Sequence, residues 1–452
     1  MGTNKLTRRR FLGAAAGLPF ILPARAWGQT VPPPSERIHV GLIGIGGRGL
    51  GNLDRFLRQD DVQVVAIADV DRLHYRDRPW EQGTRYGREA AKEAVERRYS
   101  EAMASGTYKG LKVHSDYREA CADPEIDAVV ISTPDHWHAL CTLEALRHGK
   151  DVFCEKPVTH LFAEGQAIYR EAARRGAIFQ VGSQQRSDKR FRHAANIVRN
   201  GLLGKIMRVE VGLPAGFPAA QGDSTITEPP EHVDYDFWCG PGEKLPFMAA
   251  RFHRWWRGHR AYGGGNIMDW IGHHNDIAHW ALDLDRSGPT RVEAKGWTFP
   301  EGAVYNTPID YEILCEYPGG LSWSLSSKNP LGTKIIGEDG WVYVSRSLTD
   351  SIELEASDPR WVDESFDPGP VKVYVSNDHT RNFIDGCKTR TACICPAETG
   401  HRSITPGHLG FVSQALGRPL RWDPSAETVT GDAEAQSLLM LVDYRAPWGW
   451  SP

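Results

Sequence analysis

The sequence predicts an α/β protein in which a parallel-sheet domain precedes an α/β domain with an open, mostly antiparallel sheet. The first part of the chain alternates short apolar, β-branched runs with helical segments, a pattern typical of a parallel sheet covered on both faces. After residue 182, several strand candidates alternate apolar and polar residues, as half-exposed antiparallel strands do. A chain of 452 residues also exceeds what one hydrophobic core usually supports, so two domains are expected.

Residues 1–26 have the three parts of an export signal and are set apart from the fold. Arg8-Arg9-Arg10 precede Phe11-Leu12, an apolar stretch runs from Ala14 to Leu22, and Ala24-Arg25-Ala26 ends the segment. The paired arginines are typical of the twin-arginine route, which moves folded proteins, and they predict a periplasmic or other extracytoplasmic location. A disordered basic tail is the alternative interpretation. No segment of the mature chain has the roughly 20 apolar residues that a membrane-spanning helix needs.

The remaining chain divides into a linker and two domains. Three consecutive prolines mark residues 27–35 as a linker, and we expect the first domain over 36–182 and the second over 183–452. Removing the five positive charges of the signal changes the formal net charge from −4 to −9. An acidic body without a basic stripe argues against nucleic acid as a partner. The eight cysteines show no zinc-ligand spacing, and we expect most to be buried and unreactive.

Hydrophobic periodicity gives the elements of each domain. In the first domain we expect strands over 37–43, 62–68, 112–114, 126–132, 151–154 and 177–181, and helices over 50–57, 82–104, 137–148 and 163–175. In the second we expect a helix over 191–199 and strands over 206–213, 291–299, 309–317, 321–326 and 341–345, with a hairpin turn at 318–320. The second sheet has one open face, suited to a cleft wall or a contact between subunits.

A glycine motif follows the first predicted strand. Gly44-Ile45-Gly46 and Gly49 have the G-x-G-x-x-G spacing between a strand and a helix, and Asp69 ends the next strand twenty residues later. This context predicts a dinucleotide-binding turn, in which backbone N–H groups and the helix N-terminus face the pyrophosphate. Asp69 would accept hydrogen bonds from the ribose hydroxyls, which favours NAD. Because Arg48 and Arg72 are near in sequence, NADP stays open as the alternative.

Polar groups also follow three later strands of the first domain, where ligands bind in open α/β sheets. They are the Thr133-Pro134-Asp135-His136-Trp137-His138 segment, the Glu155-Lys156-Pro157 segment, and the segment with Gln184 and Arg186. A lysine beside the nicotinamide would be desolvated and could donate or accept a proton. Glu155 could pair with it or touch the cofactor, although a Glu-Lys pair is often only a solvated surface pair.

The second domain contains Asp269-Trp270-Ile271-Gly272-His273-His274. Asp269 and His273 are four residues apart, so on a helix they lie on one side, a spacing that suits a histidine tuned by a carboxylate. Asp276 and His279 extend this face, which leaves metal binding and a purely structural role near a helix end as alternatives. The run matches no known metal-ligand motif, and we predict no metal site.

The order of these motifs resembles that of the glucose–fructose oxidoreductase, inositol dehydrogenase and rhizopine-catabolism (Gfo/Idh/MocA) family, from about Ile38 to the C-terminus. The resemblance implies a Rossmann domain followed by a domain that often forms dimers or tetramers. It implies that Lys156 and His273 are the acid/base pair, that Asp269 orients or tunes them, and that Glu155 and His138 line the nicotinamide pocket. Two regions depart from the family pattern: residues 72–108 look longer than usual, and residues 251–265, with Trp255, match no known substrate pattern.

These observations predict an NAD(P)-dependent oxidoreductase that transfers hydride to or from a carbinol carbon of a sugar, cyclitol or sugar derivative. Thr133 and Pro134 are expected at the cofactor, and Gln184, Arg186, Trp255 and His274 at a carbohydrate substrate. Export of a folded protein suggests a tightly bound, recycled cofactor. Two alternatives stay open: a redox-neutral, NAD-dependent glycoside hydrolase of the same fold, and a non-catalytic carbohydrate-binding protein.

Overall fold

Six parallel strands form the first sheet of the computed structural model, which describes residues 36–76, 83–106, 108–348, 351–363 and 365–450. The signal and linker predicted for residues 1–35 lie outside the described residues. The strand order is β3-β2-β1-β4-β5-β6 and every neighbouring pair is parallel. The strands are β1 (Ile38–Ile43), β2 (Val62–Ala68), β3 (Lys112–His114), β4 (Ala128–Ile131), β5 (Asp151–Cys154) and β6 (Phe179–Val181). This is the doubly wound order of dinucleotide-binding domains.

Helices connect these strands close to the predicted positions. They are α2 (Gly47–Leu57), α3 (Arg88–Arg98), α4 (Ser100–Ala104), α5 (Tyr117–Ala122), α6 (His138–Arg147) and α7 (Phe162–Arg175), with a short 3-10 turn η4 (Asp135–Trp137). The helix predicted over 82–104 is shorter and broken. Gly87 has a φ of +91°, so the helix begins at Arg88, and it is interrupted at Tyr99. Strand β2 is buried along its whole length, as expected for a parallel sheet covered on both faces.

The second sheet has nine strands in the order β13-β12-β11-β7-β10-β9-β8-β14-β15 and is antiparallel except for the β7–β10 pair. The strands are β7 (Ile206–Gly212), β8 (Arg291–Lys295), β9 (Glu312–Tyr317), β10 (Leu321–Ser326), β11 (Gly332–Gly337), β12 (Trp341–Arg346), β13 (Ile352–Ala356), β14 (Leu420–Asp423) and β15 (Thr428–Val429). Residues 318–320 form the predicted turn between β9 and β10. Half-buried residues alternate with buried ones along most of β12 and with exposed ones along β13, so one face of the sheet is open.

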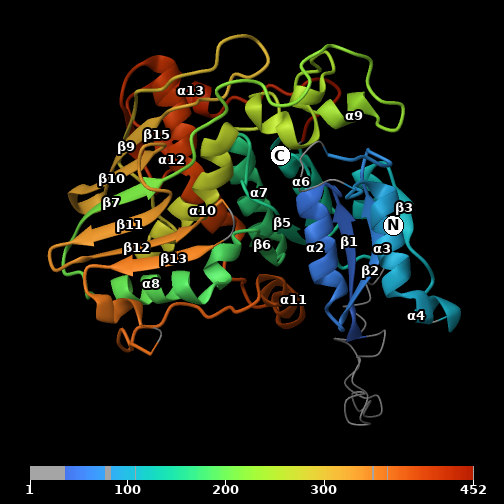
Figure 1. Cartoon of the computed structure of the whole chain (residues 1–452), viewed down its shortest axis with the longest axis horizontal. Coiled ribbons are helices and arrows are strands. Elements are labelled where there is room, and N and C mark those ends of the chain that lie inside the picture. The colour runs from blue at the N-terminus through green and yellow to red at the C-terminus, as the bar shows by residue number, and fades with distance from the viewer. Residues whose placement is uncertain (1–35, 77–82, 107, 349–350, 364, 451–452) are drawn as a thin grey trace, which may run out of the picture. The chain divides into compact units, whose positions relative to one another are not determined.

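Long helices cover the other face of this sheet (Figure 1). The helices of this half are α8 (Lys189–Arg199), α9 (Tyr235–Cys239), α10 (Gly265–Ala281), α11 (His379–Thr389), α12 (Ala397–Leu416) and α13 (Ala433–Leu439). The short 3-10 segments are η5 (Gln184–Ser187), η6 (Ala249–Arg251), η7 (His253–Gly258), η8 (Pro318–Gly320) and η9 (Pro359–Val362). Helices α8, α10 and α12 pack on the sheet, and α12 also packs against α7 of the first half. Among the described residues, no helix is both long and apolar enough to span a membrane.

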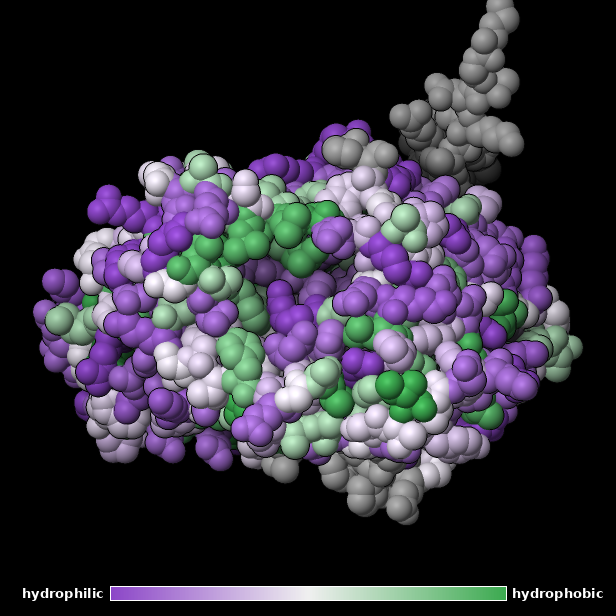
Figure 2. All heavy atoms as spheres, turned by 90° about the horizontal axis from the view of Figure 1, so that it is seen from above, coloured by the Kyte–Doolittle hydropathy of each residue, from purple (hydrophilic) through white to green (hydrophobic). Residues whose placement is uncertain are grey.

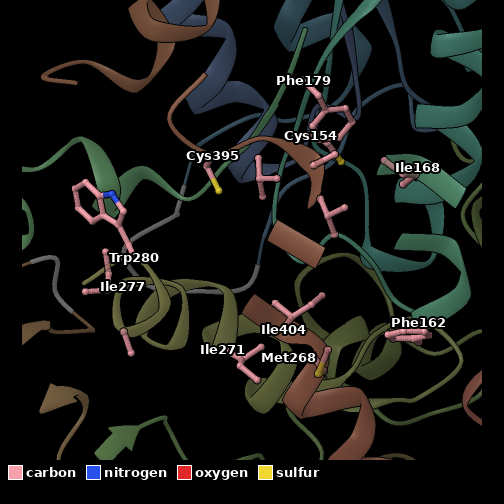
Figure 3. Packing of buried hydrophobic residues seen from close by; sticks show 14 of the residues in the cluster. Cys154, Phe162, Ile168, Phe179, Met268, Ile271, Ile277, Trp280, Cys395 and Ile404 are labelled. Atoms are coloured by element: carbon pink, nitrogen blue, oxygen red, sulfur yellow. The ribbon is translucent and has the colours of Figure 1, made fainter. Parts of the chain in front are cut away.

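Buried residues of both halves form one hydrophobic cluster that runs from Ile43 to Leu439. Figure 3 shows Cys154 and Phe179 of the first sheet near Cys395, together with Ile271 of α10 and Ile404 of α12. Helix α11 packs into the core of the first sheet, where Phe383 contacts Phe56 and Phe153 at ring-centroid distances of 6.2 and 5.7 Å. The division at residue 182 therefore stays a prediction, because side chains from both parts interleave. All eight cysteines are buried free thiols.

Candidate functional site

A cavity of about 1110 Å³ lies beside the carboxyl ends of the parallel strands and is also walled by residues of the second half. Its volume is large enough for a cofactor and a small substrate together. The lining includes the glycine turn, both predicted acid/base groups and several aromatic residues, among them Gly44, Gly46, Asp69, Thr133, Pro134, His138, Glu155, Lys156, Trp256, Asp269, Trp270 and His273. Figure 2 shows a mainly hydrophilic face of the molecule whose middle is hollowed.

The glycine turn has the close packing that its motif predicts. Gly44 has a φ of +85°, and a Cβ at Gly49 would lie 1.9 Å from the carbonyl oxygen of Gly44. Ile45 is buried, and its N–H donates to Asp69 Oδ2 at 2.5 Å, so Ile45 holds the loop and does not face the cavity. The α2 N-terminus then points its amide groups at the cavity, where phosphate binding is favourable. The site therefore fits a dinucleotide.

Asp69 directly follows β2, and both of its carboxylate oxygens accept hydrogen bonds from backbone amides. Oδ2 accepts the Ile45 amide, and Oδ1 accepts the amide of Asp71 at 2.8 Å. Burial raises the pKa of Asp69. Each oxygen keeps a second lone pair, and the residue lines the cavity, so the predicted contact with a ribose hydroxyl stays available. Arg72 pairs with Glu89 and does not line the cavity, whereas Arg48 does.

Glu155 and His138 line the cavity but are held by other protein groups. Glu155 Oε1 accepts from Asn52 at 2.9 Å and from Gln184 at 3.0 Å, while its buried Oε2 has no hydrogen-bond partner. His138 lies with Nδ1 2.8 Å from the carbonyl oxygen of Pro157 and Nε2 3.1 Å from that of Thr133. The histidine therefore ties the end of β4 to the end of β5, which positions the neighbouring Lys156.

Lys156 contacts Asp269 across the two halves. Its Nζ donates to Asp269 Oδ1 at 2.5 Å and to the Asp269 carbonyl oxygen at 2.8 Å. Arg257 Nε lies 3.0 Å from the same Oδ1. Burial lowers the pKa of Lys156, which the Asp269 carboxylate opposes. Burial alone would raise the pKa of Asp269, but Arg257 and Lys156 bring it below its usual range.

His273 lines the cavity one turn along α10 from Asp269, without a carboxylate partner. Its Nδ1 has no hydrogen-bond partner, and its ring lies edge-on to Trp270 at 5.4 Å. Burial holds the pKa of His273 well below its usual range, and Lys156 adds to this. The expectation that Asp269 tunes His273 is corrected: the carboxylate turns toward Lys156 and Arg257, because two cations satisfy it better than a neutral imidazole does.

None of the four predicted substrate residues lines the cavity. Arg186 is fully buried and binds Asp276 Oδ2 at 2.7 Å, with a second pair to Asp285 at 2.8 Å. Trp255 lies against Phe217, and the adjacent Trp256 lines the cavity in its place. Gln184 donates a hydrogen bond to Glu155 and does not itself line the cavity. His274 is buried, with its carbonyl accepting from Thr333 at 2.6 Å, because α10 packs that side on the sheet.

The alternative hypothesis, that the polar side chains of α10 bind a metal ion, is not supported by the contacts of Asp276 and His279. Asp276 is the partner of Arg186, and His279 Nε2 lies 2.7 Å from the Tyr317 hydroxyl. Both side chains are buried in the core away from the cavity.

Arg257 and Asp135 are among the charged residues of the cavity that sequence reasoning missed. Arg257 stacks on Trp256 at 4.1 Å while it pairs with Asp269. Asp135 is 1% exposed, and its Oδ2 has no hydrogen-bond partner. Burial raises the pKa of Asp135 to about 7, with Asp269 adding to the rise and Arg257 opposing it. The only earlier signal for Asp135 was its place after a strand end.

A parallel sheet with a glycine turn, and a buried lysine–aspartate pair beside a histidine, are features that fit the class of dinucleotide-dependent oxidoreductases. Residues 38–183 match the oxidoreductase family with an NAD-binding Rossmann fold, and residues 188–450 match the C-terminal alpha/beta domain of that family. The chain belongs to the Gfo/Idh/MocA oxidoreductase family. Family membership confirms the predicted fold class, the prediction of an oxidoreductase, and NAD as the cofactor type.

Individual relatives align over part of their length. Inositol 2-dehydrogenase of Rhodococcus jostii is 36% identical over 109 residues, which is 24% of this chain and 30% of that protein. Alpha-N-acetylgalactosaminidase of Shewanella oneidensis is 29% identical over 180 residues, 40% of this chain and 36% of that protein. The chain thus aligns with about a third of the length of these curated relatives.

Solved structures share the fold over most of both chains. The WlbA dehydrogenase of Bordetella pertussis, in complex with NADH and UDP-GlcNAcA, aligns with a TM-score of 0.58 and 18% identity over 86% of this chain and 99% of its own. The aldose-aldose oxidoreductase of Caulobacter crescentus, complexed with glycerol, aligns with a TM-score of 0.57 and 16% identity over 85% and 99%. At these identities the likeness concerns the fold.

Proposed function

We propose that this enzyme oxidises or reduces a carbinol carbon of a sugar, cyclitol or sugar derivative, using Lys156 and His273 on the substrate oxygen. The observation that carries the proposal is the Lys156–Asp269 pair, 2.5 Å apart, on a cavity wall that also holds His273 and the glycine turn. The presence of an inositol dehydrogenase and of an aldose-aldose oxidoreductase among the similar proteins supports this substrate class.

Gly44, Gly46 and the α2 N-terminus would hold the pyrophosphate of the dinucleotide, and Asp69 a ribose, with NAD favoured and NADP as the alternative. When bound, the nicotinamide supplies the hydride acceptor or donor. In the oxidation direction, His273 accepts the proton of the substrate hydroxyl, because its low pKa keeps the imidazole neutral. Lys156 donates a hydrogen bond to the same oxygen, and Asp269 with Arg257 fixes the position of its ammonium group.

A redox-neutral glycoside hydrolase is the second candidate, which the similarity to the Shewanella alpha-N-acetylgalactosaminidase favours. In that reaction a transient oxidation would be reversed after the glycosidic bond is cleaved, so the same groups would act twice. Purification without added nucleotide, followed by denaturation and mass spectrometry, tests for a retained cofactor. Stoichiometric NAD or NADP would support a closed redox cycle, and an empty protein would support an ordinary dehydrogenase.

Assays then separate the two reactions. Nicotinamide absorbance is followed with inositols, aldoses and sugar acids, and free sugar is measured with aryl glycosides. Net NADH formation supports the dehydrogenase, whereas sugar release with no net change supports the hydrolase. If none of these substrates turns over in the presence of NAD or NADP, the proposed substrate class is wrong.

We further propose that the protein is exported by the twin-arginine route and acts outside the cytoplasm as a homo-oligomer. The N-terminal sequence pattern supports export, and the open face of the second sheet supports subunit contact. Fractionation of cells carrying the wild-type chain or an Arg8→Lys, Arg9→Lys, Arg10→Lys variant tests export, with the variant expected to stay in the cytoplasm. Light scattering of the purified enzyme tests the oligomer.

A further inference from the structure

Two histidines and an aspartate meet on the cavity wall apart from the acid/base groups. Asp71 lies just after β2, His74 lies in the longer segment that follows it, and His253 begins η7 in the other half of the chain. His74 Nδ1 lies 2.9 Å and His253 Nε2 3.0 Å from the same atom, Asp71 Oδ2. All three residues line the cavity, so the cluster is open to small ligands on one side.

The two oxygens of Asp71 have different surroundings. Oδ1 accepts from the Leu73 amide at 3.1 Å and lies 2.8 Å from His232 Nδ1. Oδ2 makes no hydrogen bond of acceptable geometry, and neither do the two nitrogens of His74 or the Nε2 of His253. Asp71 is 1% and His74 6% exposed. The carboxylate oxygen and the imidazole nitrogens therefore lie out of solvent with one another as close partners.

The backbone of His253 is also unusual. Its φ of +45° lies in the left-handed region, which a non-glycine residue adopts at a cost. This conformation brings the imidazole against Asp71 and stacks it on His74, with ring centroids 3.6 Å apart.

We propose that Asp71, His74 and His253 bind one divalent first-row transition-metal ion, such as Zn²⁺ or Co²⁺. A carboxylate oxygen and two imidazole nitrogens are ligands that these ions prefer. Metal–ligand bonds of about 2.0–2.2 Å separate adjacent ligand atoms by roughly 3 Å, which is close to the observed spacing around Oδ2. Binding requires the two stacked rings to tilt so that their lone pairs converge on the ion.

The remaining coordination positions would face the cavity and hold water or an oxygen of a bound molecule. His232 would act as a positioning residue, because its contact with Oδ1 directs Oδ2 at the ion. The ion would also join the segment after β2 to η7, the segment that carries Arg257 four residues after His253. This inference is independent of the proposed reaction, because it uses none of the acid/base groups.

The test uses the full chain, with any purification tag removed and metals stripped by a chelator. Zn²⁺ is titrated by calorimetry at neutral pH, Co²⁺ by its visible absorption, and the metal retained after gel filtration is counted by mass spectrometry. We expect one ion per chain. His74→Ala and His253→Ala should each weaken binding by at least about 100-fold, and His232→Ala by roughly 10-fold. His148→Ala, an exposed histidine paired with Glu144, is the matched control and should bind as the wild type does.

Failure of the wild-type protein to retain Zn²⁺ or Co²⁺ at 1:1 would overturn the proposal, whether or not the variants fold. Equal binding by the wild type, His74→Ala and His253→Ala would do so as well, since it would place the ion elsewhere. Circular dichroism of each variant separates loss of the site from loss of the fold. None of these binding and folding measurements depends on turnover. Failure of the proposed reaction is therefore distinguishable from failure of the metal site.

Discussion

Lys156 Nζ and Asp269 Oδ1 lie 2.5 Å apart, although 113 residues separate them in the sequence. One residue follows β5 of the parallel sheet and the other lies in α10, so their contact joins the two halves of the chain at the cavity. Gly272 lies on the same helix, and a Cβ there would lie 3.4 Å from Lys156 Cβ, which shows how closely the lysine packs on α10. The pair explains how a buried lysine keeps its place on the cavity wall.

Replacing Lys156 should abolish most catalysis while leaving the dinucleotide site intact. We expect Lys156→Met to lower kcat/KM by about 100- to 10,000-fold, the usual contribution of a proton-transferring group. Cofactor affinity, measured by fluorescence titration, should change little because the glycine turn is untouched. Lys205→Met, at an exposed position, is the control and should retain activity. A Lys156→Met enzyme with wild-type kcat/KM would remove this lysine from the mechanism.

Asp269→Asn should both destabilise the protein and shift its pH profile. The substitution leaves the buried Lys156 and the partly exposed Arg257 without their shared anion, and removing one partner of a buried pair typically costs about 3–5 kcal/mol. The carboxylate also opposes the lowering of the Lys156 pKa by burial, so its removal lowers that pKa further. The limb of the pH–rate profile that reports Lys156 should therefore move to lower pH, which is measured as kcat/KM against pH. An unchanged profile would show that Lys156 does not titrate in the measured range.

Gly49→Ala and Gly51→Ala form a matched pair on α2. A Cβ at Gly49 would lie 1.9 Å from the Gly44 carbonyl oxygen, whereas no atom lies within 4 Å of a Cβ at Gly51. We expect Gly49→Ala to weaken NAD binding by at least about 100-fold because the turn must open. Gly51→Ala should bind NAD normally and gain roughly 0.5–1 kcal/mol of stability from better helix propensity. Isothermal titration and denaturant unfolding measure both effects. Equal NAD affinity in the two variants would contradict the assignment of this turn.

Arg186→Ala should affect stability and leave substrate affinity unchanged. The guanidinium is fully buried between Asp276 and Asp285, and its removal leaves uncompensated carboxylates, at a cost of about 3–5 kcal/mol. Arg58→Ala removes an exposed pair with Asp54 and should cost no more than about 0.5 kcal/mol. Urea unfolding gives the free energy of unfolding of each variant. The KM then separates a structural role of Arg186 from a role in substrate binding. A raised KM in a fully folded Arg186→Ala enzyme would restore the sequence-based expectation of a substrate contact.

The sequence predicted those features that depend on local pattern. The strands Lys112–His114, Asp151–Cys154 and Leu321–Ser326 have the predicted bounds, and the glycine turn follows β1 as its spacing required. Helix α12 was missed because it is buried nearly all round and contains Pro406, so it lacks the amphipathic period by which a helix is recognised. Its place between the two sheets is set by tertiary packing.

Side-chain partners were harder to predict than positions. Lys156, Asp269 and His273 do reach one cavity, but Asp269 pairs with Lys156 and also with Arg257, which comes from the irregular η7 segment. Arg186 follows a strand end, as a ligand-binding residue would. In the fold it is buried and pairs with Asp276 and Asp285, which lie 90 and 99 residues away in the sequence. Such pairs depend on the fold of several distant segments, and a single sequence gives no spacing signal for them.

Asp135 should make the stability of the protein depend on pH. Its folded-state pKa of about 7 is above the ordinary 3.8, so the folded state binds the proton more tightly than the unfolded state. The stabilisation from this proton is fully present below about pH 4 and is lost above about pH 7. Between these values it falls by roughly 1.4 kcal/mol per pH unit.

The substitution Asp135→Asn keeps the shape of the side chain and removes its titration. The difference in unfolding free energy, variant minus wild type, should therefore increase between pH 5 and pH 8, while the exposed control Asp54→Asn shows no such trend. A constant difference would mean that Asp135 is already ionised at pH 5, with Arg257 as its counter-ion.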